Sequence, residues 1–401
     1  MNPGAASTPG YSRVFSVDIF RGLTMLVMIF VNALAGVTGL PWWNYHLPAE
    51  VNGITYVDMV FPAFLFIVGM AIPLAIKRRL EKGDSPLTLW VHILVRSLSL
   101  VLLGLILANS SKVDPGLTGI SGSLWFTLSL VGAILFWNVY PPSPGRQNLY
   151  RALKGIGVLL IAAMLVIFRR RTPDGLAAWL DFSYWEILGL IGWAYLSACI
   201  LYVPLRKKRW APIVLLIALS TMNVLMKMGW LSALRDLPDY VWPFETGALA
   251  SIVMAGIVAS TIFLDSAFSR TFRQKAAWAL AYAAVLFAAG WLLTPFGISK
   301  IRATPTWCLY CAGSSVLIFL VLYWVADVRH LTKWASFVKP AGSNTLLTYL
   351  LPYLFYAVHG WYLFAFLPAQ GWPGAASSLL FTAFILGWAA VMTRVKVRLQ
   401  L

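Results

Sequence analysis

The sequence reads DIFRGLTMLVMIFVNALAGVT from Asp18 to Thr38, and only a few isolated polar residues interrupt this apolar stretch. About 20 consecutive apolar residues in an α-helix cross the hydrocarbon core of a bilayer. Lipid offers no partner for free backbone N–H and C=O groups, so a spanning segment of this kind must be helical. We therefore interpret residues 18–38 as a first membrane-spanning helix.

Runs of the same kind fill the rest of the chain. Of its 401 residues 60% are hydrophobic and 11% are charged, whereas a soluble domain carries about 25% charged residues. A chain this apolar cannot cover a surface that faces water. We predict an all-α polytopic membrane protein, a bundle of about 12 (10–12) transmembrane helices in one integral-membrane domain over residues 1–401. The expected spans are 18–38, 57–77, 88–110, 119–140, 151–169, 185–205, 210–230, 246–264, 274–294, 304–327, 341–360 and 373–393.

The net charge of +17 follows the same organisation. The basic residues lie in short clusters between the apolar runs, as orientation signals do, so we do not expect nucleic acid as a partner. With twelve spans, one set of alternate loops holds 21 Lys and Arg and the other holds 8. The positive-inside rule then places both termini of a multi-pass plasma (inner) membrane protein in the cytoplasm, with residues 1–13 as a short tail. The triplet Arg169–Arg171 is the exception to this asymmetry.

Ionisable groups inside a span are costly, which makes them candidates for function. Arg21 and Asn32 lie 11 residues apart, close to three helical turns, so they share one face of the first helix about 16 Å apart along its axis. Asp18 precedes Arg21 by three residues and can pair with it. An interior Asp–Arg pair and a structural Asn hydrogen bond explain these residues as well as a site does.

Two loops that we place on the non-cytoplasmic side are polar. The first contains His46 and Glu50, and His is the side chain best suited to proton transfer near neutral pH. A loop His is also often an ordinary surface residue. The second, PFGISKIRATPTW over residues 295–307, contains Lys300 and Arg302.

Other polar residues have local explanations. Thr55-x-x-Asp58 has the pattern of a capping box at the start of the second span. In the third span Arg96 lies near the cytoplasmic side, where it either meets an anionic ligand or extends to the interface. Cys308-x-x-Cys311 has no second ligand pair, so we expect small packing residues and no metal.

Ordered polar residues in three segments resemble a known family. FSVDIFRGLTMLVMIFVN at residues 15–32, a His-containing loop and NGITYVDMVFPAFLFIVGM at residues 52–70 resemble the heparan-α-glucosaminide N-acetyltransferase family and its bacterial relatives. GISKIRATPTWCLY and AGSNTLLTYLLPYLFY look like later segments of that family. The resemblance covers residues 13–77 most strongly and about 290–360 more weakly.

The resemblance implies an acyltransferase that moves an acetyl group from cytoplasmic acetyl-CoA, its co-substrate, onto an amino sugar or envelope glycan on the outer face. It implies that His46 is the active-site histidine and that Asn32 lies near it, both as catalytic residues. The remaining assignments follow from charge and position. Arg21, Arg96 and Asp18 are our candidates for binding acetyl-CoA, and the basic cluster at residues 77–82 would also attract its phosphates. Our candidates for binding the acceptor are Asp58, Glu50, Asn52, Lys300 and Arg302.

Two other functions remain open on the sequence. Twelve spans, and the echo between WFTLSLVG at residues 125–132 and WEILGLIG at residues 185–192, also suit a secondary transporter of a sugar or organic anion. A non-catalytic membrane scaffold has less use for polar groups inside spans. The sequence leaves open whether the protein is a monomer or a homo-oligomer.

Overall fold

The structure, a computed structural model, describes residues 14–236, 246–265, 268, 271–359 and 367–401. The predicted tail at residues 1–13 lies outside this part of the chain. Helices dominate it, and the sheet that it contains is a hairpin of β1 (Arg170–Arg171) with β2 (Ala177–Ala178). The longer helices are α1 (Phe15–Leu34), α2 (Tyr56–Glu81), α3 (Pro86–Asn109), α5 (Gly122–Trp137), α6 (Gln147–Ile167), α7 (Glu186–Leu205), α8 (Ala211–Lys227), α10 (Ala248–Leu264), α11 (Phe272–Leu292), α12 (Pro305–Tyr323), α14 (Thr345–His359) and α15 (Gly371–Arg394), and the short ones are α4 (Pro115–Thr118) and α13 (Lys339–Ser343).

Each of the twelve predicted spans coincides with one of the longer helices. In the described residues, eight helical segments are long and apolar enough to cross a membrane. The all-α membrane class is therefore confirmed. Helices α5, α8 and α10 are apolar but have only 16 or 17 residues, and α14 has 15, short of the 20 or so that a full crossing takes. Crossing by these four stays a prediction.

The span predicted at residues 341–360 is divided. Asn344 leaves helical geometry at φ −132° and ψ 51°, so α13 ends at Ser343 and α14 begins at Thr345. The Asn344 amide instead holds the last residues of the chain. Its Nδ2 donates to the carbonyl of Val397 at 2.8 Å, and its Oδ1 accepts from the N–H of Leu399 at 3.1 Å.

Helix α10 forms the centre of one half of the bundle, and nearly all of its residues are buried. It crosses α2 at two glycines: a methyl group on Gly69 would overlap the carbonyl of Val253, and one on Gly256 would overlap the carbonyl of Phe66. Small residues let helix backbones approach closely in membranes. These two glycines therefore let α2 and α10 pack closely against each other.

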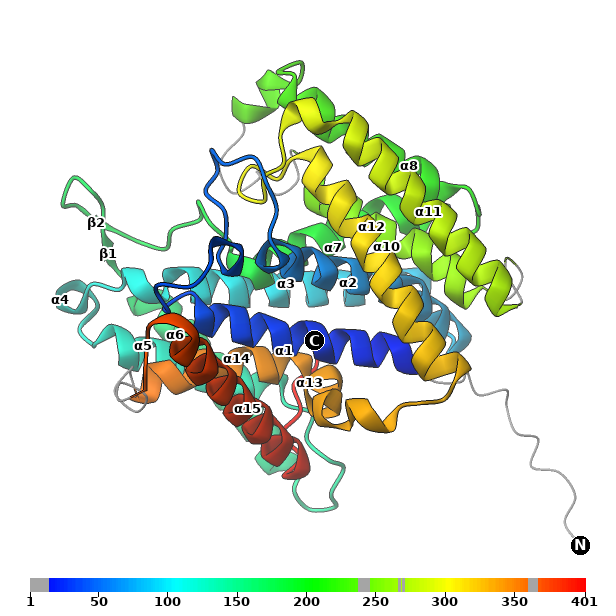
Figure 1. The fold of residues 1–401 in the computed structure, drawn as a ribbon. Helices are drawn as coiled ribbons and strands as arrows, with labels where there is room; N and C mark the ends of the chain where they lie inside the picture. The colour runs from blue at the N-terminus through cyan, green and yellow to red at the C-terminus, as the bar shows by residue number, and fades with distance from the viewer. Residues whose placement is uncertain (1–13, 237–245, 266–267, 269–270, 360–366) are drawn as a thin grey trace, which may run out of the picture.

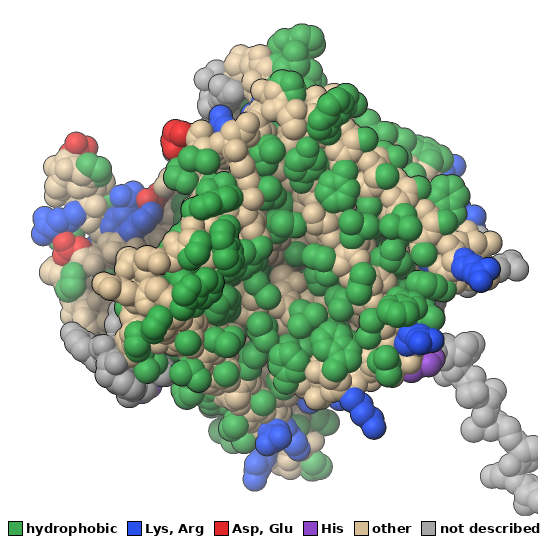
Figure 2. All heavy atoms as spheres, in the orientation of Figure 1, with side chains coloured by type: hydrophobic (Ala, Val, Ile, Leu, Met, Phe, Trp, Pro, Cys, Tyr) green, Lys and Arg blue, Asp and Glu red, His purple; other side chains and the backbone are tan. Residues whose placement is uncertain are grey.

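The helices form two groups around α1, α2, α3 and α7 (Figure 1). Helices α8, α10, α11 and α12 lie on one side, and α5, α6, α14 and α15 lie on the other. The face drawn in Figure 2 is covered largely by hydrophobic side chains, with Lys and Arg gathered toward its edges. This is the distribution expected of a surface whose middle contacts lipid.

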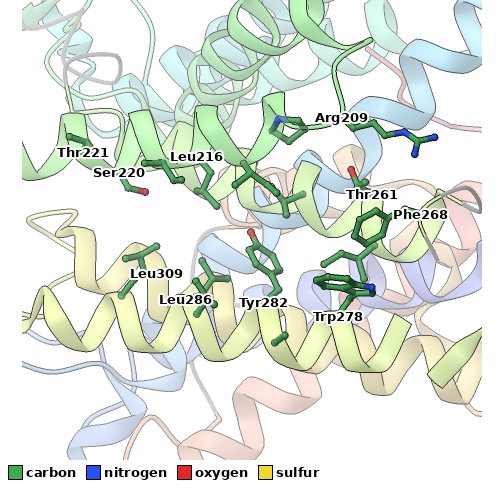
Figure 3. Close-up of a pocket in the computed structure, with 18 of the residues that line it drawn as sticks. Arg209, Leu216, Ser220, Thr221, Thr261, Phe268, Trp278, Tyr282, Leu286 and Leu309 are labelled. Carbon is green, nitrogen blue, oxygen red and sulfur yellow. The ribbon is translucent and has the colours of Figure 1, made fainter. Parts of the chain in front are cut away.

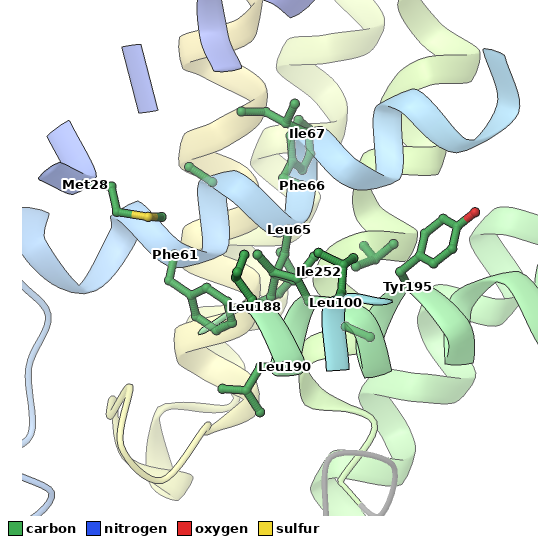
Figure 4. Close-up of a cluster of buried hydrophobic side chains, with 14 of the residues drawn as sticks. Met28, Phe61, Leu65, Phe66, Ile67, Leu100, Leu188, Leu190, Tyr195 and Ile252 are labelled. Atoms are coloured by element: carbon green, nitrogen blue, oxygen red, sulfur yellow. The ribbon is translucent and has the colours of Figure 1, made fainter. Parts of the chain in front are cut away.

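A buried hydrophobic cluster joins α2 to its neighbours (Figure 4). Phe61 and Leu65 of α2 lie beside Leu188 of α7 and Ile252 of α10 there. The core fixes α2, and α2 carries groups of interest at both of its ends.

Candidate active site

His46 and Asp58 form a short contact where the first long loop returns to α2. The His46 Nδ1 atom lies 2.7 Å from Asp58 Oδ1, and the Asp58 side chain is 2% exposed whereas that of His46 is 41% exposed. Thr55 caps α2, and the predicted capping box with Asp58 is present. The Thr55 hydroxyl also bonds the carbonyl of Tyr45 at 3.0 Å, which fixes the residue before His46.

The contact with Asp58 determines the chemistry available to His46. A carboxylate accepts hydrogen bonds, so Nδ1 of His46 carries the ring proton and donates a hydrogen bond to Asp58. The tautomer follows from this network. Nε2 of a neutral imidazole is then the acceptor, on a side chain that remains exposed. The arrangement suits proton transfer at Nε2.

Lys300 completes this cluster from a loop that is distant in the sequence. Its Nζ lies 3.2 Å from Nδ1 and 3.1 Å from Nε2 of His46. The two ring lone-pair directions diverge, so one ammonium at equal distance from both cannot make two in-plane hydrogen bonds. We read the contact as a positive charge beside the imidazole ring. Burial lowers the pKa of Lys300, and the nearby Asp58 carboxylate offsets only part of this.

The two predicted polar loops are joined to one another. The Asn52 Oδ1 atom accepts from the N–H of Ile298 at 2.6 Å, and the N–H of Gly53 donates to the Ile298 carbonyl at 3.0 Å. The Arg302 guanidinium lies at the same place, since a methyl group on Gly297 would be 3.0 Å from it and 3.9 Å from Asn52 Oδ1. His46, Asp58, Asn52, Lys300 and Arg302 are therefore brought together at one end of α2.

Asn32 and Glu50 are less closely placed. Both are exposed, Asn32 in the last turn of α1 and Glu50 in the first long loop. Within the described part of the chain, no hydrogen bond connects either of them to His46. Their predicted roles stay predictions.

The other end of α2 borders a cavity of about 610 Å³. Four arginines from four segments lie on its wall: Arg21 of α1, Arg78 of α2, Arg96 of α3, and Arg398 near the chain end. Arg21 lies 3.5 Å from Asp18 and donates to the Gly342 carbonyl at 3.3 Å. A second cavity of about 510 Å³ shares Arg21 and Arg78 with the first and is also lined by Asp18.

Arg96 is held partly inside the protein. Its guanidinium lies 5.2 Å from the centre of the Tyr195 ring, a cation–π contact. Its buried Nε has no hydrogen-bond partner among the described residues. A buried donor without a partner is costly, and an anion in the cavity is a natural partner for it. The four arginines can bind a polyanion with charge-assisted bonds.

Helix α2 sets the separation of the two places. Asp58 and Arg78 are 20 residues apart, about 30 Å along the helix. The cavity extends along α2 from Arg78 to Phe64, which is six residues or about 9 Å from Asp58. It thus runs most of the way from the arginines toward His46. Met28 of α1 lines it, and Phe61 belongs to the buried cluster near Met28 (Figure 4).

Sequence reasoning missed two residues near this cavity. Arg398 counts only as an orientation signal in the sequence, because a residue near the chain end gives no sign of folding back against α1. Glu186 begins α7 at φ +54° and accepts hydrogen bonds from Tyr349 at 2.8 Å and Tyr353 at 3.1 Å. Glu186 lies inside the expected span 185–205. The rule that ionisable groups within spans are candidates for function is therefore the signal that could have found it.

Comparison with known proteins places the chain in a family. A family described as "Domain of unknown function (DUF5009)" matches residues 13–242. Heparan-alpha-glucosaminide N-acetyltransferase of Mus musculus is 34% identical over 155 residues, which are 36% of this chain and 23% of that protein. The protein of the same name in Homo sapiens is 40% identical over 97 residues, 24% of this chain and 14% of that protein. The match thus spans less than a quarter of either curated relative. The chain belongs to the DUF5009 family and is a distant, partial relative of the heparan-alpha-glucosaminide N-acetyltransferases.

Proposed function

We propose that this protein is a transmembrane acyltransferase that transfers an acetyl group from cytoplasmic acetyl-CoA to the amine of an amino sugar or envelope glycan at the opposite face. The observation that carries the proposal is the arrangement along α2. The His46–Asp58 pair occupies one end of this helix, and the cavity with four arginines opens at the other. The relation to N-acetyltransferases supports the reaction type.

The arginine cavity is the donor site in this proposal. Acetyl-CoA carries several phosphate groups, and guanidinium groups bind phosphate with charge-assisted, often paired hydrogen bonds. Arg21, Arg78, Arg96 and Arg398 converge on the cavity from different segments, so a bound phosphate would join them. The apolar part of the cavity, lined by Met28 and Phe64 among others, would then hold the thioester arm.

The His46 cluster is the acceptor site. Nε2 of His46 takes a proton from the acceptor amine as its nitrogen forms a bond to the thioester carbonyl carbon. The carbon–sulfur bond then breaks, and the CoA thiolate leaves with its electron pair and is protonated. Asp58 holds His46 in the required tautomer. The Lys300 ammonium is available to stabilise negative charge on the carbonyl oxygen, as is the amide of Asn32 once the substrate is bound.

The remaining polar groups at this end are assigned to the acceptor. Glu50, Asn52 and Arg302 lie on the two joined loops that also carry His46 and Lys300, and they offer both charge signs to a sugar. The sequence makes Asp58 a candidate for binding the acceptor, but its two oxygens already contact His46 and Thr55. We therefore propose that it acts on His46 instead. The plasma (inner) membrane, with both termini cytoplasmic, is the setting that places acetyl-CoA on the arginine side.

The test is to incubate detergent-purified protein with acetyl-CoA and a panel of amino sugars, and to measure free CoA and product mass. An acyltransferase releases one CoA for each sugar that gains an acetyl group. If no sugar gains mass while proteoliposomes take up a sugar or organic anion unchanged, the protein is a transporter. A mass increase on the wild-type protein before the sugar is added, absent from His46→Ala, would show that His46 carries the acetyl group in an intermediate.

A further inference from the structure

A large groove lies away from both sites, between α8 and α11 (Figure 3). Its volume is about 890 Å³. Helix α8 packs on α10 and α11 packs on α12, which leaves α8 and α11 facing each other across the groove. Along α8 it extends from Pro212 to Val224, 12 residues or about 18 Å. This length exceeds the depth of one leaflet, since half of the hydrocarbon core is about 15 Å thick.

The walls of the groove are apolar and exposed. Ile213 and Ile217 of α8 are 52% and 59% exposed, and Val285 of α11 is 64% exposed. The Tyr282 side chain extends into the groove from α11, and its hydroxyl donates to the Ala255 carbonyl at 3.2 Å. A polar substrate would find few partners here. An unfilled space of this size forfeits the dispersion contacts of its lining, so in a membrane an apolar chain fills it.

One end of the groove is basic. Arg209 is the charged residue among the described groove-lining side chains, and Figure 3 shows it at the edge of the groove on the loop before α8. It belongs to the run Arg206-Lys207-Lys208-Arg209. Trp210 beside it is 53% exposed and Trp278 across the groove is 52% exposed. Tryptophan is enriched where the headgroups of a bilayer meet its hydrocarbon core.

A single charge at one end of a long apolar groove, at headgroup level, matches an amphiphile with an anionic head. We propose that this groove binds an acidic phospholipid, with one acyl chain along α8 and α11 and the phosphate at Arg209. The four basic residues favour an acidic over a zwitterionic headgroup, since Lys and Arg near the membrane surface attract anionic lipids. The site is separate from the acetyl-transfer proposal and does not depend on it.

The test compares lipid retention by intact-protein mass spectrometry after delipidation and re-addition of phosphatidylglycerol or phosphatidylcholine. The wild-type protein should retain one phosphatidylglycerol in preference to phosphatidylcholine. Arg209→Gln should weaken that binding roughly tenfold, the effect of losing a hydrogen bond to a charged group. Lys207→Gln, a neighbouring change outside the groove, should have a much smaller effect.

A second pair of variants tests the chain-binding part. Ala281→Phe places a ring in the groove and should abolish retention of both lipids. Ala284→Phe, at an exposed position of α11 that does not line the groove, should leave retention unchanged. All variants must elute and unfold thermally like the wild type. Equal retention of the two lipids, or unchanged phosphatidylglycerol binding by both Arg209→Gln and Ala281→Phe, would overturn the proposal.

Discussion

At the scale of single residues, Asp58 performs two tasks with one carboxylate. Its Oδ2 closes the capping box with Thr55, and its Oδ1 contacts His46. The helix terminus therefore holds the carboxylate in place before any substrate arrives. A histidine positioned by a buried carboxylate is a general arrangement for proton transfer, because the carboxylate fixes which ring nitrogen carries the proton.

We predict that Asp58→Asn lowers turnover by about 10²-fold or more, since an amide can hold His46 in the wrong tautomer. Rates of CoA release by protein of wild-type thermal stability measure this. Asp84→Asn is the control, because Asp84 pairs with Arg79 at 3.0 Å near the opposite end of α2. A near wild-type rate for Asp58→Asn would confine Asp58 to helix capping.

The pH dependence should report Lys300. Burial gives its ammonium a pKa below the ordinary value of 10.5, so it loses its proton at a lower pH than an exposed lysine does. If its positive charge assists the reaction, activity falls on the alkaline side as pH rises through that lowered pKa. In Lys300→Arg the side chain stays protonated, so the alkaline decline should move to higher pH. An unchanged alkaline limb would remove Lys300 from the reaction.

The sequence indicates the residue types of this site but not all of its contacts. The capping box is legible from Thr55 and Asp58 because both partners lie within one helical turn. The contact of Lys300 with His46 joins residues 254 positions apart and depends on how the two loops pack. No local pattern encodes that packing. Asp58 likewise looks like an acceptor ligand or a cap until the loop that carries His46 is seen to return to it.

At the scale of the elements, α2 connects the two proposed sites and is fixed by its crossing with α10. The expected span 57–77 gives its location, and Gly69 indicates close packing. The partner helix is not evident from sequence, because many spans contain small residues. The short helix α10 is tolerated here because protein rather than lipid surrounds it.

The crossing predicts a sharp difference between two glycines inside helices. Gly69→Ala should destabilise the protein by about 1–3 kcal/mol, because the methyl group overlaps the Val253 backbone. Gly155→Ala in α6 has no neighbour within 4 Å and should be neutral or stabilising by up to about 1 kcal/mol. Thermal unfolding in detergent measures both. Equal midpoints for the two variants would mean that α2 and α10 do not cross closely.

At the scale of the whole molecule, the expected orientation rests on the distribution of positive charge. The arginine triplet that breaks the pattern is partly neutralised in the fold. Arg171 pairs with Asp114 at 2.7 Å, and Lys112 nearby pairs with Asp181 at 2.6 Å. Burial alone would raise the pKa of Asp181, but the bonds from Lys112 and Ser183 outweigh it and lower that pKa well below its ordinary value. These ion pairs hold Arg171 and Lys112 locally, but the triplet still counts against the predicted orientation, because the positive-inside rule counts Lys and Arg rather than net charge.

Topology is testable without any assumption about chemistry. Reporter fusions after Lys82 and after Lys208 should both report the cytoplasm, since both positions lie in basic clusters of the loop set that holds 21 Lys and Arg. A non-cytoplasmic signal after Lys208 together with a cytoplasmic one after Lys82 would show that the short helix α5, which lies between the two positions, is miscounted as a crossing. A non-cytoplasmic signal after Lys82 would contradict the predicted orientation of the first two spans.

The central claim is that His46 mediates transfer of an acetyl group between compartments. The most direct measurement uses proteoliposomes with acetyl-CoA on one side and an accepting amino sugar on the other. Wild-type protein should produce free CoA on the donor side and acetylated sugar on the acceptor side. His46→Ala should produce neither, whereas His92→Ala, at an exposed position of α3, should retain both. Acetylation at a near wild-type rate by folded His46→Ala protein would contradict the account.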